Sequence, residues 1–319
     1  MQLKYLLALA LIGISTPVVA QSCTFTNTDL NWGSINLAVS ANYDTTGTFT
    51  ANCSGTALST VRICPNFNAG SGGVNATGSE RYMLAGANQL RYNIYRNSTR
   101  TTVWGSQTWG LAPTPPTINI ILNAGGTGTG SQILYGRVFS GQTALPAGTY
   151  TSLFSGTNTQ IAYAYSTVGT CAAIGLTNAT SVPFTTSLRY NTSCSVTATT
   201  LNFGSSGVIS SNIDTSNSVS VTCTTGTPYT VSLSGGNSGA TDPTLRKLAN
   251  AGNTAFVTYG IYRDAARSLP WGSTIGTNTA AGTGTGSAQI YAGYGRVPPQ
   301  TTPAAQTYTD TIIMTVTYN

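Results

Sequence analysis

The chain has 319 residues, of which only 6% are charged, and it contains no histidine. Without imidazole it lacks the commonest general base and a common metal ligand, so the composition argues against an enzyme. The formal charge of +6 comes from scattered cations with no basic run, which argues against nucleic-acid binding. We therefore expect no catalytic residues, no cofactor, no metal site and no nucleic-acid partner.

The first twenty residues have the pattern of a secretory signal peptide. Lys4 precedes an apolar run from Tyr5 to Ile14, and a small-residue site ends at Ala20. The run is too short to span a bilayer, so we expect cleavage after Ala20 and export of the remaining chain. Six cysteines in an exported chain favour three disulfides.

The remaining sequence contains two copies of one pattern, which share five landmarks in the same order. The landmarks are the cysteines followed by LNWGS (23–34) and LNFGS (194–205), the second cysteines Cys53 and Cys223, YNIYR (92–96) and YGIYR (259–263), the GTGTGS segments (126–138 and 282–297), and GTYT (148–151) and QTYT (306–309). Several ordered matches at matched spacing indicate an internal duplication.

Short alternating runs rich in Val, Thr, Ile and Tyr lie between these landmarks, separated by turn residues. This pattern favours an all-β fold with one immunoglobulin-like β-sandwich per copy. We expect an N-terminal domain at 21–190 and a C-terminal domain at 191–319. Six cysteines allow fifteen pairings, and the repeat selects Cys23–Cys53 and Cys194–Cys223, which leaves Cys64 with Cys171.

The copies differ first in an insertion. Between the shared Trp-Gly and the GTGTGS segment, the first copy has eleven more residues, including SQTWGLAPTPP. Its prolines exclude it from a central strand, because proline cannot donate a ladder hydrogen bond. We expect a stiff loop that holds Trp109 and Leu111 near solvent, with the alternative that Trp109 folds back onto its own sandwich.

The copies differ again at their ends. The first copy continues into SVPFTTSLRY at 181–190, an apolar alternating strand, whereas the second stops at Asn319 without an equivalent. A sandwich that lacks an edge strand exposes an apolar groove, which a strand from another chain can fill. Only Gln21 and Ser22 precede Cys23 in the exported chain, so we expect it to accept a strand, to donate none, and to end a polymer.

The motifs LNFGS, YGIYRD…PWG, GTGTGSAQIYAGYGRVPPQ and TYTDTIIMTVTY within 194–319 resemble the spore coat protein U domain. That domain builds the pilin-type subunits of archaic chaperone–usher pili. The two-domain arrangement resembles the tip adhesin subunit of Csu-type pili. The resemblance implies an adhesin at the pilus tip (fimbrium) on the cell surface, active in attachment and biofilm formation. It also implies four partners: a periplasmic chaperone, an outer-membrane usher, an adjacent pilin subunit that donates its N-terminal strand, and an abiotic or host surface.

The resemblance also implies site residues. The candidate surface-binding loops contain Trp109, Leu111, Ala112 and Pro113 in the insertion, Ala173, Ile174 and Leu176 after Cys171, and Leu145. The candidate contact strand for the chaperone or donor strand contains Ile312, Ile313, Met314, Val316 and Tyr318. Two alternatives stay open: a carbohydrate-binding adhesin in which Trp109 stacks on sugar rings, and a structural pilus or coat subunit that binds no ligand.

Overall fold

The structure is a computed structural model that describes residues 20–36, 41–78, 80–110, 112, 114–165 and 169–318. In these ranges the ordered elements are twenty β-strands and two short 3-10 helices, which confirms the all-β prediction. No helix in the described ranges is long and apolar enough to cross a membrane. Except for Ala20, the predicted signal peptide lies outside the described residues.

The first twelve strands form two sheets around one hydrophobic core, and we call β1–β12 the N-terminal unit. An eight-stranded sheet has the order β1-β3-β8-β6-β5-β9-β12-β2, and a four-stranded sheet has the order β11-β10-β4-β7. The elements are β1 Ser22–Asn27, β2 Leu30–Ile35, β3 Tyr43–Ser54, β4 Thr60–Phe67, β5 Arg81–Ala85, β6 Asn88–Tyr95, β7 Ile118–Ile121, β8 Thr127–Val138, β9 Gly148–Phe154, η1 Gly156–Asn158, β10 Thr159–Tyr165, η2 Cys171–Ala173, β11 Thr180–Ser181 and β12 Phe184–Tyr190.

The remaining strands surround a second core, and we call β13–β20 the C-terminal unit. Its sheets have the orders β13-β14-β19-β17-β16 and β18-β15-β20. The strands are β13 Cys194–Ala198, β14 Ile213–Cys223, β15 Pro228–Leu233, β16 Arg246–Ala249, β17 Phe256–Tyr262, β18 Ala280–Thr283, β19 Ala288–Val297 and β20 Met314–Tyr318.

The apolar segment at the seam of the two copies is strand β12, and it closes the N-terminal unit. Its inward side chains Phe184, Thr186, Leu188 and Tyr190 are all buried, whereas the residues between them reach the surface. This period of two is that of a strand with one face in a core. β12 runs antiparallel to β9 on one side and parallel to β2 on the other.

The three predicted disulfides are present. Cys23–Cys53 and Cys194–Cys223 each join directly paired residues of two antiparallel strands, at equivalent places in the two units. Cys64–Cys171 spans 107 residues and ties β4 to η2.

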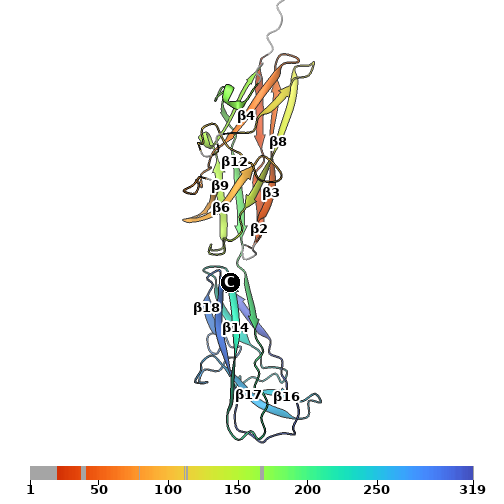
Figure 1. The fold of residues 1–319 in the computed structure, drawn as a ribbon, viewed down its shortest axis with the longest axis vertical. Coiled ribbons are helices and arrows are strands. Elements are labelled where there is room, and N and C mark those ends of the chain that lie inside the picture. The colour runs from red at the N-terminus through yellow and green to blue at the C-terminus, as the bar shows by residue number, and fades with distance from the viewer. Residues whose placement is uncertain are drawn as a thin grey trace, which may run out of the picture.

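The two units follow one another along the long axis of the molecule (Figure 1). The loop before β9 touches the C-terminal unit, where Pro146 forms an isolated bridge with Thr225. The Thr225 hydroxyl also donates to the Thr143 carbonyl oxygen at 3.1 Å. On the same side, the Asn36 side-chain amide donates to the Ser193 hydroxyl at 3.1 Å.

Candidate functional site

A groove crosses the C-terminal unit beside its core. It consists of two adjoining cavities of about 620 and 300 Å³, and we call the smaller one, which reaches Trp271 and Leu233, the inner cavity. Residues 200–207 form one wall and residues 302–310 the other, while Leu248, Tyr259 and Trp271 line the space between them. In the described part of the chain no strand lies between the two walls, since the adjacent five-stranded sheet ends at β16.

The wall at 302–310 is the counterpart of β9 and the loop before it. In the N-terminal unit the Tyr150 hydroxyl donates to the Pro146 carbonyl oxygen four residues earlier, at 2.8 Å. In the C-terminal unit the Tyr308 hydroxyl donates to the Ala304 carbonyl oxygen in the same way, at 2.7 Å.

The wall at 200–207 is the counterpart of β2. Gly33 and Gly204 both have a left-handed backbone, with φ of 67° and 73°. Each amide donates to the side-chain oxygen of the asparagine two residues earlier, Asn31 at 2.7 Å and Asn202 at 2.8 Å. Because β12 lies between β2 and β9 in the first unit, the groove is the place that an equivalent strand would fill in the second.

The predicted contact strand borders this groove only in part. Ile312 and Met314 line the inner cavity, and Val316 packs partly buried against the core. Ile313 and Tyr318 are exposed, with Ile313 67% accessible. The prediction missed the longer wall at 302–310, although the repeat could have located it by matching QTYT with GTYT in β9.

Asp310 is the one charged side chain among the described residues that line the groove. Its carboxylate accepts a hydrogen bond from the Tyr259 hydroxyl at 2.8 Å and another from the Asn237 amide at 2.7 Å. Burial, and then the hydrogen bond to the Asp310 carboxylate, raise the pKa of Tyr259 above its ordinary value. The tyrosine therefore keeps its proton at physiological pH and donates a hydrogen bond to the carboxylate.

Trp109 does not project into solvent, so the expectation of an exposed indole is wrong. Its side chain is only 8% accessible, and the buried Arg81 guanidinium lies over the ring, 4.4 Å from the centroid. A buried cation stacked on the ring fixes the indole as a packing residue. Ala112 is half-buried, and Leu111 and Pro113 lie outside the described residues.

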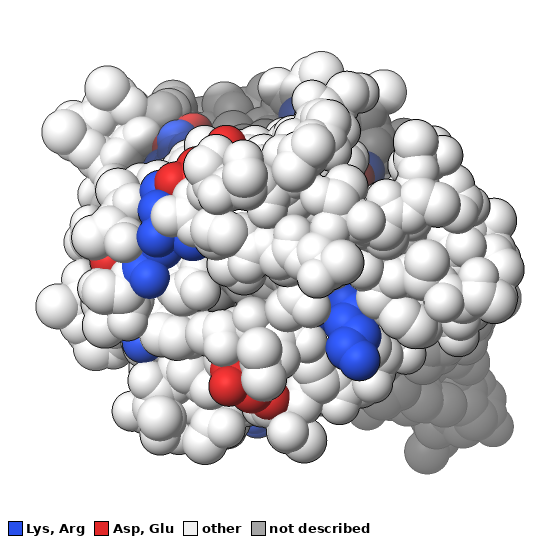
Figure 2. All heavy atoms as spheres, turned by 90° about the horizontal axis from the view of Figure 1, so that it is seen from below, with Lys and Arg blue, Asp and Glu red and all other residues white. Residues whose placement is uncertain are grey.

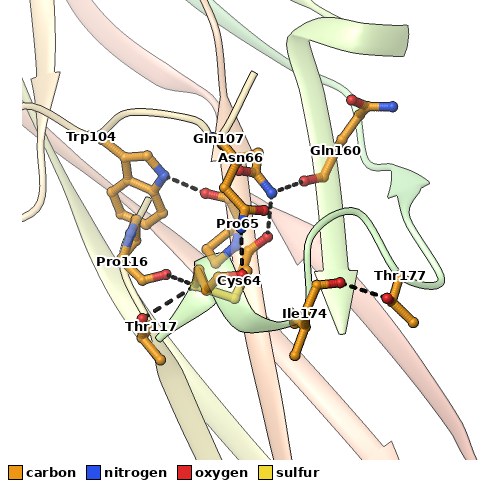
Figure 3. The surroundings of a disulfide bond; sticks show 11 residues. Cys64, Pro65, Asn66, Trp104, Gln107, Pro116, Thr117, Gln160, Ile174 and Thr177 are labelled. Carbon is orange, nitrogen blue, oxygen red and sulfur yellow. Dashed lines mark hydrogen bonds between the residues drawn. A yellow bond between two sulfur atoms is a disulfide. The ribbon is translucent and has the colours of Figure 1, made fainter. Parts of the chain in front are cut away.

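Hydrogen bonds attach the insertion to the sheet beside the Cys64–Cys171 disulfide (Figure 3). The Gln107 amide donates to the Asn66 side-chain oxygen at 2.8 Å, and just before the insertion the Trp104 indole donates to the Pro65 carbonyl oxygen at 2.9 Å. The Gln107 side chain also donates to the Cys171 carbonyl oxygen. This network agrees with the prediction of a stiff loop, and it also holds the loop against β4 and η2.

The segment after Cys171 has mixed exposure. Ala173 is exposed and Leu176 is 38% accessible, but Ile174 is 8% accessible and packs with the disulfide and Ala162. The prediction that Ile174 binds a surface is therefore wrong, since its side chain fills a small core under η2.

Leu145 lies at the end of the N-terminal unit that faces the C-terminal unit. It is half-buried against the N-terminal core and belongs to the loop that meets the C-terminal unit through Pro146 and Thr225.

The opposite end of the N-terminal unit carries two exposed apolar side chains that the sequence analysis missed. Leu58 and Ile121 are each 72% accessible. They lie at the same end of the four-stranded sheet, because Leu58 is in the turn before β4, Thr60 pairs with Ile121, and the Leu122 amide donates to the Ser59 carbonyl oxygen at 2.9 Å. Leu58 also has a left-handed backbone, with φ of 61°, which is unusual for leucine. The neighbouring glycine and threonines gave no signal that this leucine faces solvent.

Charge is sparse on the surface. Figure 2, which views the molecule from below, shows a mostly uncharged face with a few basic and acidic side chains, some of which adjoin one another. In the described residues no group of three or more His, Cys, Asp or Glu side chains is arranged to hold a metal ion.

The two tandem sandwiches, one closed by β12 and one with an open groove, define a class of pilin-type proteins. The family model of the Spore Coat Protein U domain matches residues 8–157 and 180–315, one match per copy of the repeat. The chain belongs to this family. "Protein U" of Myxococcus xanthus is 31% identical over 129 residues, which cover 37% of this chain and 72% of that relative.

One solved structure supports the same fold, and a second is reported beside it. The CsuC–CsuE chaperone–tip adhesion subunit pre-assembly complex from archaic chaperone-usher Csu pili of Acinetobacter baumannii contains a similar chain, with a TM-score of 0.51 and 15% identity over 92% of this chain and 99% of that one. The CupB6 tip adhesin of Pseudomonas aeruginosa matches at a TM-score of 0.40 and 12% identity, covering 92% of this chain and 93% of that one. The first likeness identifies the units as immunoglobulin-like, pilin-type sandwiches.

Proposed function

We propose that this protein is a pilus-tip adhesin with two domains, 21–190 and 191–319. The C-terminal domain accepts the N-terminal strand of an adjacent pilin subunit, and the N-terminal domain attaches to a surface and promotes biofilm formation. A periplasmic chaperone holds the groove until an outer-membrane usher assembles the pilus on the cell surface. The observation that carries the proposal is the groove between 200–207 and 302–310, which matches the place of β12.

The energetics favour an external strand. In the N-terminal unit, β12 buries Phe184, Leu188 and Tyr190 almost completely. Each such side chain stabilises a fold by about 1.5–3 kcal/mol when it leaves water. Their sum approaches the whole stability of a typical domain, about 5–15 kcal/mol, so a unit without this strand is at best marginal.

The attachment surface in this proposal is the end of the N-terminal unit that carries Leu58 and Ile121. β3 runs from Tyr43, beside Asn36 at the contact with the C-terminal unit, to Ser54, which precedes the Leu58 loop. Leu58 and Ile121 therefore lie at the end of the N-terminal unit opposite the C-terminal unit, which is the end away from the rest of the fibre in this proposal. Burial of each against an apolar surface contributes about 1.5–3 kcal/mol, and many pili on one cell multiply the effect.

Strand acceptance can be tested with the full exported chain from Gln21, with and without a copy of residues 182–190 fused after Asn319 through a flexible linker. We call the fused protein the strand fusion. It should show a higher thermal midpoint for the C-terminal unit and less aggregation than the unfused chain. A matched fusion with Leu188→Asp in the copied strand should give no gain. Equal stability of the unfused chain and the strand fusion would contradict the proposal.

Attachment can be tested on the strand fusion with Leu58→Asn and Ile121→Ser, because asparagine tolerates the left-handed backbone of position 58. Binding to polystyrene should fall about tenfold or more for each change. Ile133→Ser is the matched control, since Ile133 is 44% accessible but lies in the middle of β8. Loss of binding on addition of sugars, with no effect of the two variants, would favour a carbohydrate-binding adhesin instead.

A further inference from the structure

Among the described residues that line the groove, Asp310 carries the one charged side chain, and it is paired with a buried tyrosine. Tyr259 is 2% accessible and donates its hydroxyl to Asp310 Oδ2 at 2.8 Å. Asp310 Oδ1 accepts the amides of Asn237 at 2.7 Å and Thr311 at 2.8 Å. Both Tyr259 and Asp310 line the inner cavity, beside Trp271 and Leu233. Asp310 Oδ2 therefore keeps capacity for one more hydrogen bond, and Asp310 lines both cavities of the groove.

The N-terminal unit shows what meets this position when a strand is in place. The counterpart of Tyr259 is Tyr92, since each ring stacks edge-on against the aromatic of the LNWGS or LNFGS motif, at 5.9 and 5.8 Å between centroids. The counterpart of Asp310 is Ser152, because each follows the Thr-Tyr-Thr motif. Thr186 of β12 pairs with Ser152 in the ladder.

Thr186 places a hydroxyl in the middle of β12, the strand that closes the N-terminal unit. It is fully buried, and its oxygen lies 3.1 Å from the Tyr92 hydroxyl oxygen and 3.3 Å from the Ser152 carbonyl oxygen. Phe184 and Leu188, on either side of it, fill the apolar parts of the same slot.

A strand hydroxyl at this position should contribute more stability in the second unit than in the first. Ser152 is neutral, whereas Asp310 is a carboxylate that a docked strand would remove from water. A buried carboxylate without enough donors is strongly destabilising, and hydrogen bonds to charged groups are stronger than those between neutral ones. An apolar side chain at this position would cover the carboxylate without satisfying it.

We infer that Tyr259 and Asp310 form a register-setting polar subsite, which selects a donor strand with threonine or serine at its central inward position. The inference rests on the proposed function, because it names the chemistry of the strand that the groove accepts. By the pairing of β12 with β9, the hydroxylated residue lies opposite Asp310, and bulky apolar residues lie two positions before and after it, opposite Ile312 and Tyr308. A slip by two residues would place an apolar side chain on the carboxylate, so the subsite fixes one register.

The test uses the strand fusion and changes its copied strand. Thr186→Val in the copy keeps the shape and removes the hydroxyl, and should lower the thermal midpoint of the C-terminal unit by about 5–10 °C. Thr186→Ser in the copy should keep most of the midpoint. Exchange of the central threonine and the following leucine, Thr186→Leu with Leu188→Thr, keeps the composition and moves the hydroxyl, and should cost at least as much as Thr186→Val.

A second arm changes the groove. With Tyr259→Phe in the chain, the difference between the threonine and valine copies should shrink, because the hydroxyl has lost one partner. A valine copy as stable as the threonine copy overturns the subsite, and leaves strand acceptance intact as long as both copies stabilise the chain over the unfused form. If neither copy stabilises the chain, strand acceptance fails and the subsite falls with it.

Discussion

The Asp44 carboxylate accepts two hydrogen bonds from the Arg137 guanidinium, at 2.8 and 2.9 Å, across the β3–β8 pair. The same fork recurs between Asp214 and Arg296, at 2.8 and 2.8 Å, across β14–β19. The duplication has thus kept an ion pair at one place in both sheets. Because these side chains are roughly one-third exposed, with 27% to 36% of their surfaces accessible, water screens each pair to about 0.5–1 kcal/mol.

These pairs predict the acid side of the stability profile. The hydrogen bonds from Arg137 and Arg296 are the largest cause of a pKa below 3.8 for Asp44 and Asp214 in the folded protein. A carboxyl with a depressed folded pKa contributes stability above its unfolded value and loses it as pH falls through the folded value. The thermal midpoint should therefore decrease as the pH is lowered below about 4.

At alkaline pH, stability should decrease as the pH rises. Burial raises the pKa of Tyr150 to about 12, so its contribution is complete below pH 10 and is lost as pH rises toward 12. The chain has no histidine, and all six cysteines are paired. We expect a flat thermal midpoint between about pH 5 and 9, measured by calorimetry across that range. A step of several degrees near neutral pH would contradict this assignment.

Arg81 should be among the most sensitive positions of the N-terminal unit. Its guanidinium is fully buried and donates to the carbonyl oxygens of Asn68 at 2.8 Å, Phe67 at 2.9 Å and Trp104 at 2.6 Å. Arg81→Met leaves these buried acceptors without donors, and should cost about 3–5 kcal/mol in the free energy of unfolding. Arg91→Met is the control, because the Arg91 side chain is 40% accessible, and urea denaturation should place its change below about 1 kcal/mol.

Trp109→Ala separates packing from adhesion. Removal of this nearly buried indole from its place over Arg81 should destabilise the N-terminal unit by about 3 kcal/mol. Attachment per folded molecule should stay unchanged, since the ring does not face solvent. The pair of measurements is chemical denaturation and polystyrene binding, and a variant of normal stability with lost attachment would restore Trp109 as a contact residue.

The sequence predicted those features that depend on local pattern or on the repeat. Alternation identified β12, and matched landmarks identified the disulfides and the unit that lacks a strand. The direction of loop side chains was not predictable in this way. Trp109 is buried because Arg81 comes from β5, nearly thirty residues away, and Ile174 is buried because the Cys64 disulfide draws η2 onto β4. A loop has no periodic pattern of apolar residues, so its sequence does not predict which side chains are buried or what they contact.

The Cys64–Cys171 disulfide should stabilise the N-terminal unit more than Cys23–Cys53 does. It closes a separation of 107 residues against 30, which the chain-entropy model converts to about 5 and about 3.6 kcal/mol. It also holds η2 against β4, where the Gln107 side chain binds the Cys171 carbonyl oxygen.

The Cys64→Ala/Cys171→Ala variant should therefore lose stability and, in hydrogen exchange, should lose protection in the insertion and the η2 segment together. The matched Cys23→Ala/Cys53→Ala variant should keep protection in both, because its strands remain paired along β1 and β3. Equal losses of stability in the two variants, with the insertion protected in both, would show that the long-range crosslink does not organise this side of the sandwich.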